Sequence, residues 1–314
     1  MGLNFSYPMN KIWLLLSPLL MLSGCTGLVQ DIDPAILPQA DPALVIHCYI
    51  SPQDSVLTAV VSESRTSVGT QTDSSGLNAI ANARVTLSGA TSSVTLSFDP
   101  KQALYQVSAR AFRVEAGHTY QLSVVLPDGR RATASSRVPL AQPVADVLVD
   151  SVRNSASALG VDYFVTLRWL DTPGEPNYYQ VAGDNSYGSF GRFISSQGTW
   201  VEQAYQAVNR IGFEGYNESP FILDTDRDGQ ALTSSRGRVY MSVFADNRLP
   251  QRPFAVNVYL VSANESYYQY VEQVLTQARN QNNPFAEPTL IRSNIEGGLG
   301  CFGAYTKTTL PLRL

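Results

Sequence analysis

Three aspartates at alternate positions are the clearest candidate for ligand chemistry in the sequence. They are Asp224, Asp226 and Asp228, and Gly229 follows the last of them. Carboxylates at this spacing begin many calcium-binding loops, because the side chains converge on one cation and the glycine permits a sharp turn. The glutamate that closes such a loop is missing, since the twelfth position is Ser235. Two interpretations therefore stay open, a calcium site and a solvated β-turn, and the sequence favours the turn.

A second set of candidate side chains is aromatic and lies in a stretch rich in glycine and serine. Tyrosine and tryptophan offer an apolar ring face and a polar edge, which suit contact with a sugar, a peptide or a protein partner. The candidates for ligand binding are Tyr178, Tyr179, Tyr187 and Trp200, with Phe190 and Phe193 beside them. Packing within a sheet is the favoured alternative for the same residues.

Motifs for catalysis are absent from the sequence. It has no Gly-x-Ser-x-Gly elbow, no Walker loop and no His-Glu-x-x-His pair. Its two histidines, His47 and His118, leave little room for a histidine-based metal site or an acid–base centre. We therefore predict that the chain is not an enzyme, with no catalytic residues and no cofactor beyond the calcium candidate. Paired carboxylates of a surface hydrolase are the less favoured alternative.

The residues up to Cys25 predict how the protein is attached. Lys11 precedes an apolar run, Ile12–Leu22, and Ser23-Gly24-Cys25 follows. A run this short is typical of a secretory signal, because a permanent span needs about 20 apolar residues. Small residues followed by cysteine form a bacterial lipobox, in which the Cys25 thiol receives the lipid. Two or more acyl chains then give stable anchoring to a membrane.

Residues 1–25 are thus predicted to be a lipoprotein signal peptide, and residues 26–43 a proline-containing tether. The tether reaches at most roughly 50 Å when extended. Thr26 and Gly27 follow the cysteine instead of an acidic residue that would suggest retention at the inner membrane. We therefore expect a protein lipid-anchored at the outer membrane, and the sequence leaves open whether it faces the periplasm or the cell surface.

Composition narrows the class of protein further. Charged residues are only 15% of the 314, against roughly 25% in an average soluble protein, and the formal net charge is −4. A nucleic-acid partner is excluded, since such a protein should carry a basic face. The hydrophobic share of 44% is too high for a disordered chain. The length suffices for one large or two ordinary domains.

Short alternating segments separated by Gly, Asp-Gly and Pro predict an all-β fold of two consecutive immunoglobulin-like β-sandwich units. The first would span residues 44–139 and the second residues 140–314. A hairpin turn is expected at Pro127-Asp128-Gly129. The predicted strands include Leu44–Ile50, Val56–Val61, Arg84–Ser88, Ser93–Phe98, Val161–Leu170, Arg238–Ala245 and Phe254–Ser262.

One α-helix is expected near residues 265–280, inserted near the C-terminus of the second unit. Ser262-Ala263-Asn264-Glu265 has the form of a capping box. Apolar residues then recur at helical spacing, and core packing is favoured over a ligand surface for them. They are Tyr267, Tyr268, Val271, Val274, Leu275 and Ala278.

The C-terminal segment carries closely spaced glycines and a cysteine. Gly297, Gly298, Gly300 and Gly303 permit positive φ angles and tight backbone packing, and we expect Phe302 and Tyr305 to seal an edge of the second sheet. Cys48 and Cys301 fall in different predicted units. Two buried thiols are therefore favoured over a disulfide, although the oxidising envelope would allow one.

Two parts of this segment, Asn283–Pro288 and Ser293–Tyr305, resemble a family when taken with the preceding helix and the lipobox. The family is the Bacteroidota lipoprotein family called domain of unknown function 4249. The similarity covers the whole mature chain and includes Pro173–Tyr179, whereas Cys48 and Cys301 depart from the family pattern. The resemblance implies an outer-membrane lipoprotein built of β-sandwiches, often encoded beside a TonB-dependent transporter. It implies no catalytic residues.

Together these features predict a binding or accessory protein at the outer membrane, with an unknown ligand. It would be attached through its N-terminal lipid and would work with a TonB-dependent transporter in nutrient uptake. The alternative is a structural or assembly component of a cell-envelope complex.

Overall fold

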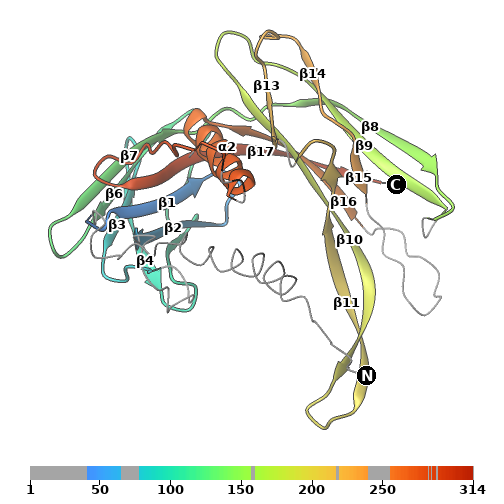
Figure 1. Cartoon of the computed structure of the whole chain (residues 1–314), viewed down its shortest axis with the longest axis horizontal. Coiled ribbons are helices and arrows are strands. Elements are labelled where there is room, and N and C mark those ends of the chain that lie inside the picture. The colour runs from blue at the N-terminus through green and yellow to red at the C-terminus, as the bar shows by residue number, and fades with distance from the viewer. Residues whose placement is uncertain are drawn as a thin grey trace, which may run out of the picture. The chain divides into compact units, whose positions relative to one another are not determined.

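The computed structural model describes residues 41–64, 78–156, 160–216, 219–239, 255–281, 283, 285–287 and 289–313 (Figure 1). Within strands, the side chains of residues 187–190 and 202–206 lie outside this description. Cys25, most of the tether and the end of the strand predicted over Arg238–Ala245 also lie outside the described residues. Among the helices it describes, none combines the length and the apolar character needed to cross a bilayer.

Seven consecutive strands supply most of the first hydrophobic core, and strand alternation explains which side chains enter it. In β1, Ile46, Cys48 and Ile50 are buried while the residues between them are half-buried. Gly129 has φ 92° in the turn between the sixth and seventh strands, so the predicted hairpin is confirmed. The strands are β1 (Leu44–Ile50), β2 (Val56–Glu63), β3 (Arg84–Ser88), β4 (Ser93–Asp99), β5 (Leu104–Ser108), β6 (Thr119–Val125) and β7 (Arg131–Arg137).

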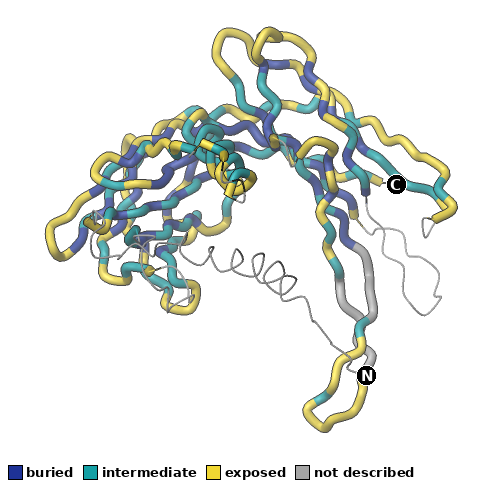
Figure 2. Tube along the Cα trace, in the orientation of Figure 1, coloured by how far each residue is buried: buried dark blue, intermediate teal, exposed yellow. Residues whose placement is uncertain are grey.

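Two sheets enclose the second core. The strands of the smaller, five-stranded sheet are β8 (Val144–Arg153), β9 (Val161–Leu170), β12 (Gly212–Phe213), β14 (Ala231–Thr233) and β15 (Gly237–Val239). Facing it are β10 (Tyr178–Ile194), β11 (Trp200–Arg210), β13 (Phe221–Leu223), β16 (Ala255–Ala263) and β17 (Leu299–Leu312). Leu167 and Trp169 of β9 pack with Val181 of β10 and with Val258 and Leu260 of β16. Figure 2 shows the buried residues along the middle of these strands.

Strand β17 joins the two regions in one sheet of 12 strands, ordered β11-β10-β16-β17-β1-β2-β5-β4-β3-β6-β7 with β13 beside β10. It pairs antiparallel with β16 and parallel with β1. The expectation that the glycine-rich tail seals an edge is therefore wrong: β17 is an interior strand, and Phe302 is buried in the first core. The boundary between units 44–139 and 140–314 stays a prediction.

The interior position of β17 explains a glycine. Gly300 has φ 111°, and a Cβ there would lie 2.0 Å from the carbonyl oxygen of Ile46 on β1. A side chain would clash with the neighbouring backbone and would also be strained by its φ angle. Gly297 shares the positive φ, at 78°. The glycines thus permit close strand pairing, whereas the sequence suggested a closing edge.

Helix α2 (Glu265–Asn280) confirms the predicted helix. Its N-cap is Asn264, whose side chain accepts a hydrogen bond from the Tyr267 amide at 3.1 Å. The predicted capping box is wrong because Ser262 still belongs to β16. The described fold is thus mostly β with one helix near the C-terminus, as the all-β expectation required.

The apolar stripe of α2 is only half-buried, and no residue of the helix is fully buried. Its tyrosines instead make ring contacts with the strands below. Tyr267 meets Tyr49 of β1 edge to face, with ring centroids 5.3 Å apart, and Tyr270 lies 5.4 Å from the His47 ring. The helix therefore covers the β1–β17 pair through aromatic rings.

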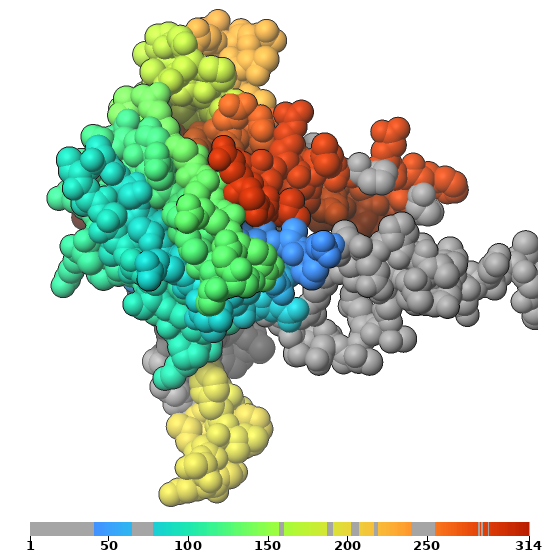
Figure 3. Space-filling view, turned by 90° about the vertical axis from the view of Figure 1, so that its left-hand side faces the viewer, coloured from blue at the N-terminus to red at the C-terminus, as the bar shows by residue number. Residues whose placement is uncertain are grey.

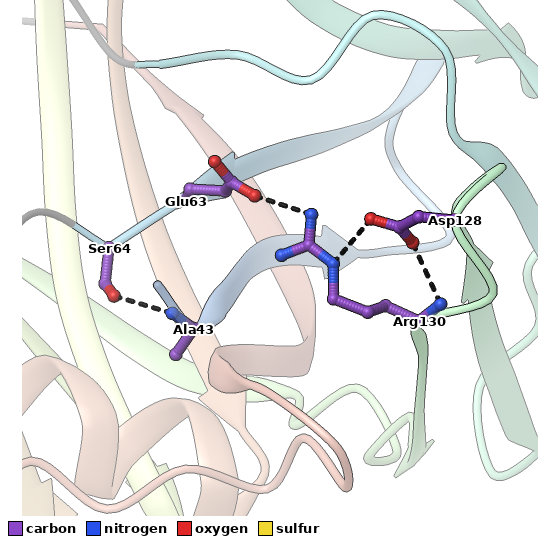
Figure 4. A network of polar contacts seen from close by, with 5 residues as sticks. All are labelled: Ala43, Glu63, Ser64, Asp128 and Arg130. Atoms are coloured by element: carbon purple, nitrogen blue, oxygen red, sulfur yellow. Dashed lines mark hydrogen bonds and ion pairs between the residues drawn. The ribbon is translucent and has the colours of Figure 1, made fainter. Parts of the chain in front are cut away.

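An arginine ties the β6–β7 hairpin to the end of β2 (Figure 4). The Arg130 guanidinium contacts Glu63 at 2.6 Å and Asp128 at 2.7 Å. Asp128 also accepts a hydrogen bond from the Arg130 amide at 2.9 Å. Beside it, the Ser64 hydroxyl accepts a hydrogen bond from the Ala43 amide at 2.9 Å. These surface contacts fix the ends of β1 and β2.

Candidate functional site

A cleft of about 1120 Å³ is lined by both sheets of the second region. Residues from β9, β12 and β15 contribute on one side and residues from β10, β11 and β16 on the other. The volume lies just above the range for small-ligand sites, roughly 300–1,000 Å³. The side chains that give it chemical character are Asp162, Phe164, Asp184, Tyr216, Arg236, Arg238 and Tyr259.

Two glycines set the inner wall of the cleft. A Cβ on Gly183 of β10 would lie 2.7 Å from Cδ1 of Ile211, and one on Gly237 of β15 would lie 2.6 Å from the Phe213 ring. Ile211 and Phe213 therefore pack directly onto backbone from both sheets. These contacts hold the segment Ile211–Phe213 against both sheets, with Gly212 exposed between two buried residues.

Two arginines at β15 lie at the cleft with fixed guanidinium groups. Cζ of Arg236 lies 4.0 Å from the centroid of the Phe164 ring, a cation–π distance, and its Nη2 contacts Asp150 at 2.9 Å. Nη2 of Arg238 contacts Asp162 at 2.9 Å. Because they are two residues apart along an extended segment, the arginines share one face. They offer guanidinium donors to a ligand from defined positions.

Tyr259 on β16 faces the cleft and donates a hydrogen bond to the Asp184 carboxylate. The other Asp184 oxygen accepts from Asn257 at 3.2 Å. Burial, followed by the bond to Asp184, raises the pKa of Tyr259 to about 12. The phenol therefore stays protonated at physiological pH, and Asp184 stays bound to it.

A tyrosine also lies at the other wall. Tyr216 is 43% exposed, and its hydroxyl accepts a hydrogen bond from the Gln180 side chain at 3.2 Å. The Tyr216 side chain is thus partly accessible to a ligand, while Gln180 fixes the position of its hydroxyl. Together the described lining offers ring faces, guanidinium donors and carboxylate acceptors, which is the chemistry for binding a polar ligand with flat apolar surfaces.

The aromatic residues singled out in the sequence do not meet at this cleft. Tyr178 stacks on Tyr268 of α2, with ring centroids 4.5 Å apart and planes 16° apart. Tyr179 is buried and donates to Asp171 at 2.7 Å. Neighbouring residues on a strand face opposite sides, so these two cannot serve one surface. Trp200 lies at the far end of the β10–β11 hairpin and is 69% exposed.

The side chains of Tyr187 and Phe190 lie outside the described residues, so their role stays a prediction. Sequence reasoning missed Phe164, Tyr216 and Tyr259, which occupy ordinary strand or turn positions. One signal was present: Arg236-Gly237-Arg238 places two guanidinium groups on the same side of an extended segment. Nothing in the sequence indicated which strands would face them.

The aspartate motif forms a cluster with a different third member. Carboxylate oxygens of Asp171, Asp224 and Asp228 lie within 4.8 Å of one another, and Asp226 is outside this group, with φ 64°. Asp171 directly follows β9 and lies far upstream of the motif in sequence. The spacing of the motif alone therefore could not reveal it as a member of the cluster.

Backbone amides already bond to these carboxylates. Gly174 donates to Asp228 at 2.9 Å, Asn177 to Asp224 at 3.0 Å and Gly229 to Asp171 at 2.8 Å. The cluster thus ties the loop after β9 to the turn after β13, and Asp171 and Asp224 are buried in it. Remaining carboxylate lone pairs are also suitable cation ligands. Calcium binding stays the less favoured interpretation, and Asp171 would be an added ligand in such a site.

Cys48 and Cys301 are free, buried thiols on the neighbouring strands β1 and β17. His47, rather than Cys48, lies opposite Cys301 in the register. Burial raises the pKa of both thiols, that of Cys301 to about 12. Both therefore stay protonated near neutral pH, which is the state expected of packing residues.

The described residues thus form a mostly β protein with one helix and a cleft of a size that can hold a ligand. The chain belongs to the family described as Domain of unknown function (DUF4249), whose pattern matches residues 29–310. This range includes every described strand except the last two residues of β17, and the family membership expected from the sequence is confirmed. A comparison with curated proteins gave no match. The family description assigns no activity, so function must be argued from the site.

Proposed function

We propose that this chain is a non-enzymatic binding protein of the outer membrane, anchored through lipid on Cys25, and that its cleft takes the ligand. The single observation that carries the proposal is the cleft of about 1120 Å³ with aromatic and charged groups on opposing walls. The lipobox supports the membrane attachment. The second part of the proposal is that the protein assists a TonB-dependent transporter in nutrient uptake. The family resemblance supports this part.

The charge of the lining favours a neutral or zwitterionic ligand. Three acidic and three basic residues line the cleft: Asp162, Asp184, Glu214, Arg210, Arg236 and Arg238. A polyanion or polycation would meet as much repulsion as attraction there. Ring faces with guanidinium donors and carboxylate acceptors suit an oligosaccharide or a short peptide. We therefore propose these two ligand classes, and no cofactor.

Binding is tested with the full chain on arrays of oligosaccharides and peptides, followed by calorimetry on any hit. Arg236→Ala should weaken binding at least tenfold, because it removes a guanidinium held on the Phe164 ring. Arg130→Ala is the matched control, since both side chains are 42% exposed and ion-paired but Arg130 lies in the first region. Equal affinities of the two variants would reject the cleft as the binding site.

The transporter part is tested separately by purifying the acylated chain from its native membrane in a gentle detergent. Recovery of a TonB-dependent barrel, identified by mass spectrometry, supports the proposal. Stoichiometric recovery of other envelope proteins, irrespective of nutrient supply, would support the structural alternative instead. Recovery of the chain alone would count against an accessory role and leave the cleft result standing.

A further inference from the structure

The far end of the β10–β11 hairpin is an exposed surface with unusual chemistry. β10 pairs with β16 only as far as Ser186, whereas its pairing with β11 continues to Ile194, opposite Trp200. Within the described residues, the outer part of this hairpin has two strands and no third. Figure 2 colours its end as exposed, and in Figure 3 the same end is the yellow segment at the bottom of the view.

Four large apolar side chains gather at this end, which we name the hairpin tip. Their exposed fractions are 51% for Phe193, 63% for Ile194, 69% for Trp200 and 47% for Val201. Phe193 lies opposite Val201, and Ile194 lies opposite Trp200, so one apolar pair occupies each face of the ribbon. A strand pair that packs on one protein layer needs only one apolar face. Two such faces suit an apolar medium that surrounds the tip.

The turn that closes the tip is uncharged and bonded within itself. No charged residue occurs from Phe193 to Val201. The Ser195 amide donates to the Thr199 carbonyl at 2.8 Å, the Gly198 amide donates to the Ser195 carbonyl at 2.9 Å, and the Ser195 and Thr199 hydroxyls lie 2.8 Å apart. Polar groups that already have partners cost less to remove from water. The turn can therefore leave water with its apolar neighbours.

The size of the tip matches the depth of a lipid interface. Three to four residues separate the Phe193–Val201 pair from the end of the turn, which is about 10 Å at roughly 3.3 Å per residue. Apolar faces of interfacial proteins enter about 5–10 Å. Tryptophan is enriched at this depth. Arg192, which is exposed directly before the tip, would then meet the phosphate groups of the lipids.

The chain outside the structure also favours a membrane as the occupant. The described residues begin at Asp41, and the predicted lipid anchor at Cys25 lies only a short tether away. An extended tether of this length reaches roughly 50 Å, so an anchored chain is always close to the bilayer. Tethering of this kind raises the effective concentration of the second contact without any new affinity.

We propose that the hairpin tip, formed by Phe193, Ile194, Trp200 and Val201, is a second membrane contact that enters the lipid interface. With the lipid anchor it fixes the orientation of the chain, and hence of the cleft, relative to the bilayer. The anchor belongs to the proposed function, on which the tether argument rests. The contact of the hairpin tip with lipid does not depend on the anchor and is measured separately.

Tryptophan fluorescence tests the tip contact directly. The full chain is reconstituted in vesicles of phosphatidylethanolamine and phosphatidylglycerol whose acyl chains carry bromine near the headgroup. After Cys25 the sequence has two tryptophans, the buried Trp169 and the exposed Trp200, so the difference between the parent chain and Trp200→Phe isolates the signal of Trp200. We expect that signal to be quenched at least twofold, blue-shifted and protected from aqueous iodide. A Trp200 that stays open to iodide and unquenched would overturn the proposal.

Matched variants separate the tip from general effects. Ile194→Asp places a charge beside Trp200 and should reduce the quenching at least twofold, whereas Leu170→Asp, at a residue 59% exposed on β9, should leave it unchanged. Protection of Trp200 in native membranes but not in vesicles would overturn the proposal in favour of a protein partner. Mass spectrometry of the N-terminal peptide reports the anchor independently. Unmodified Cys25 with quenched Trp200 would reject only the anchor, and lipidated Cys25 with unquenched Trp200 only the tip contact.

Discussion

Buried side chains from all seven strands β1 to β7 fill the first core, whereas the sheets around the second core also form a cleft and extend the β10–β11 hairpin beyond it. Both regions use the same alternation of apolar and polar residues. They differ in what occupies the polar positions. In the first region Arg130 binds carboxylates on the surface, and in the second Arg236 and Arg238 lie at a cleft.

The polar lining of the cleft thus arises where the two sheets of the second region leave space between them. It does not depend on an unusual helix or strand. Asp162, Arg238 and Tyr259 occupy regular strand positions. In a closed sandwich the same positions would have to be apolar, because buried charges without partners are costly. In our proposal the first region therefore acts as a supporting frame, and the cleft of the second region takes the ligand. Four predictions test this distinction between the regions.

The largest effect is expected where the regions join. Gly300→Ala brings a Cβ to within 2.0 Å of the Ile46 carbonyl oxygen and forces a non-glycine residue to φ 111°. We expect a loss of about 4 kcal/mol or more in the free energy of unfolding, measured with urea. Gly129→Ala is the control: its φ is 92° but no atom lies within 4 Å, so only about 1–2 kcal/mol should be lost. Similar losses would show that φ strain alone matters.

Next, each core can be weakened separately. Leu87→Ala in the first core and Leu167→Ala in the second each remove a fully buried side chain, and each should cost about 2–5 kcal/mol. Because β17 belongs to the sheet that spans both regions, we expect one unfolding transition that shifts in both variants. Calorimetry showing two separate transitions, each moved by one variant, would instead establish independent domains. The exposed Leu170→Ala should change stability by less than about 0.5 kcal/mol.

An intermediate effect is expected at alkaline pH. Folding raises the pKa of Cys301 from 9.0 to about 12 and that of Tyr259 from 10.0 to about 12, mainly through burial. A group whose pKa is raised on folding adds stability below its unfolded pKa and loses it as pH rises through the folded value. The contribution of these two groups to the free energy of unfolding should therefore be constant below about pH 9 and fall towards pH 12. Urea unfolding at several pH values measures this, and Tyr259→Phe should flatten the fall above pH 10. An unchanged slope in that variant would refute the role of Tyr259.

The smallest effect concerns the aspartate cluster. Because backbone amides already bond to Asp171, Asp224 and Asp228, we expect 1 mM calcium to leave the melting temperature of the chelated protein within about 1 °C. Calorimetric titration should show no heat. A clear rise in melting temperature that disappears in Asp171→Asn would establish a calcium site and make the cluster functional.

Local patterns allowed much of the strand structure to be predicted. The bounds of β1, β3 and β9 agree with the sequence because their alternation is clear, and the helix was visible from its apolar spacing. β17 was misjudged, since its glycines resemble a loop until their contact with β1 is known. For the hairpin β10–β11 the sequence indicates only the start of a strand, at Asn177–Val181, because Gly, Ser and Asn obscure the alternation beyond it.

The cleft could not be predicted, because its residues come from strands that are distant in sequence. Arg238 and Asp162 are 76 residues apart, and so are brought together only by the pairing of β15 with β9. The aspartate cluster shows the same limit: the motif supplied Asp224 and Asp228, while Asp171 joined them through the fold. A single sequence records which residues are available, and the topology decides which of them meet.

The parallel pairing of β1 with β17 has a consequence for the order in which the chain folds. β1 pairs early with β2, but Val45 pairs with Leu299, so its second neighbour becomes available only after β17 has been synthesised. Contacts between distant segments slow folding, because the intervening chain must first be ordered. We expect the nascent protein to stay unfolded for longer than a protein of local contacts. Late closure would suit the secretion that the proposed lipid anchor requires, because a secreted chain is threaded through the membrane in an extended state before it folds.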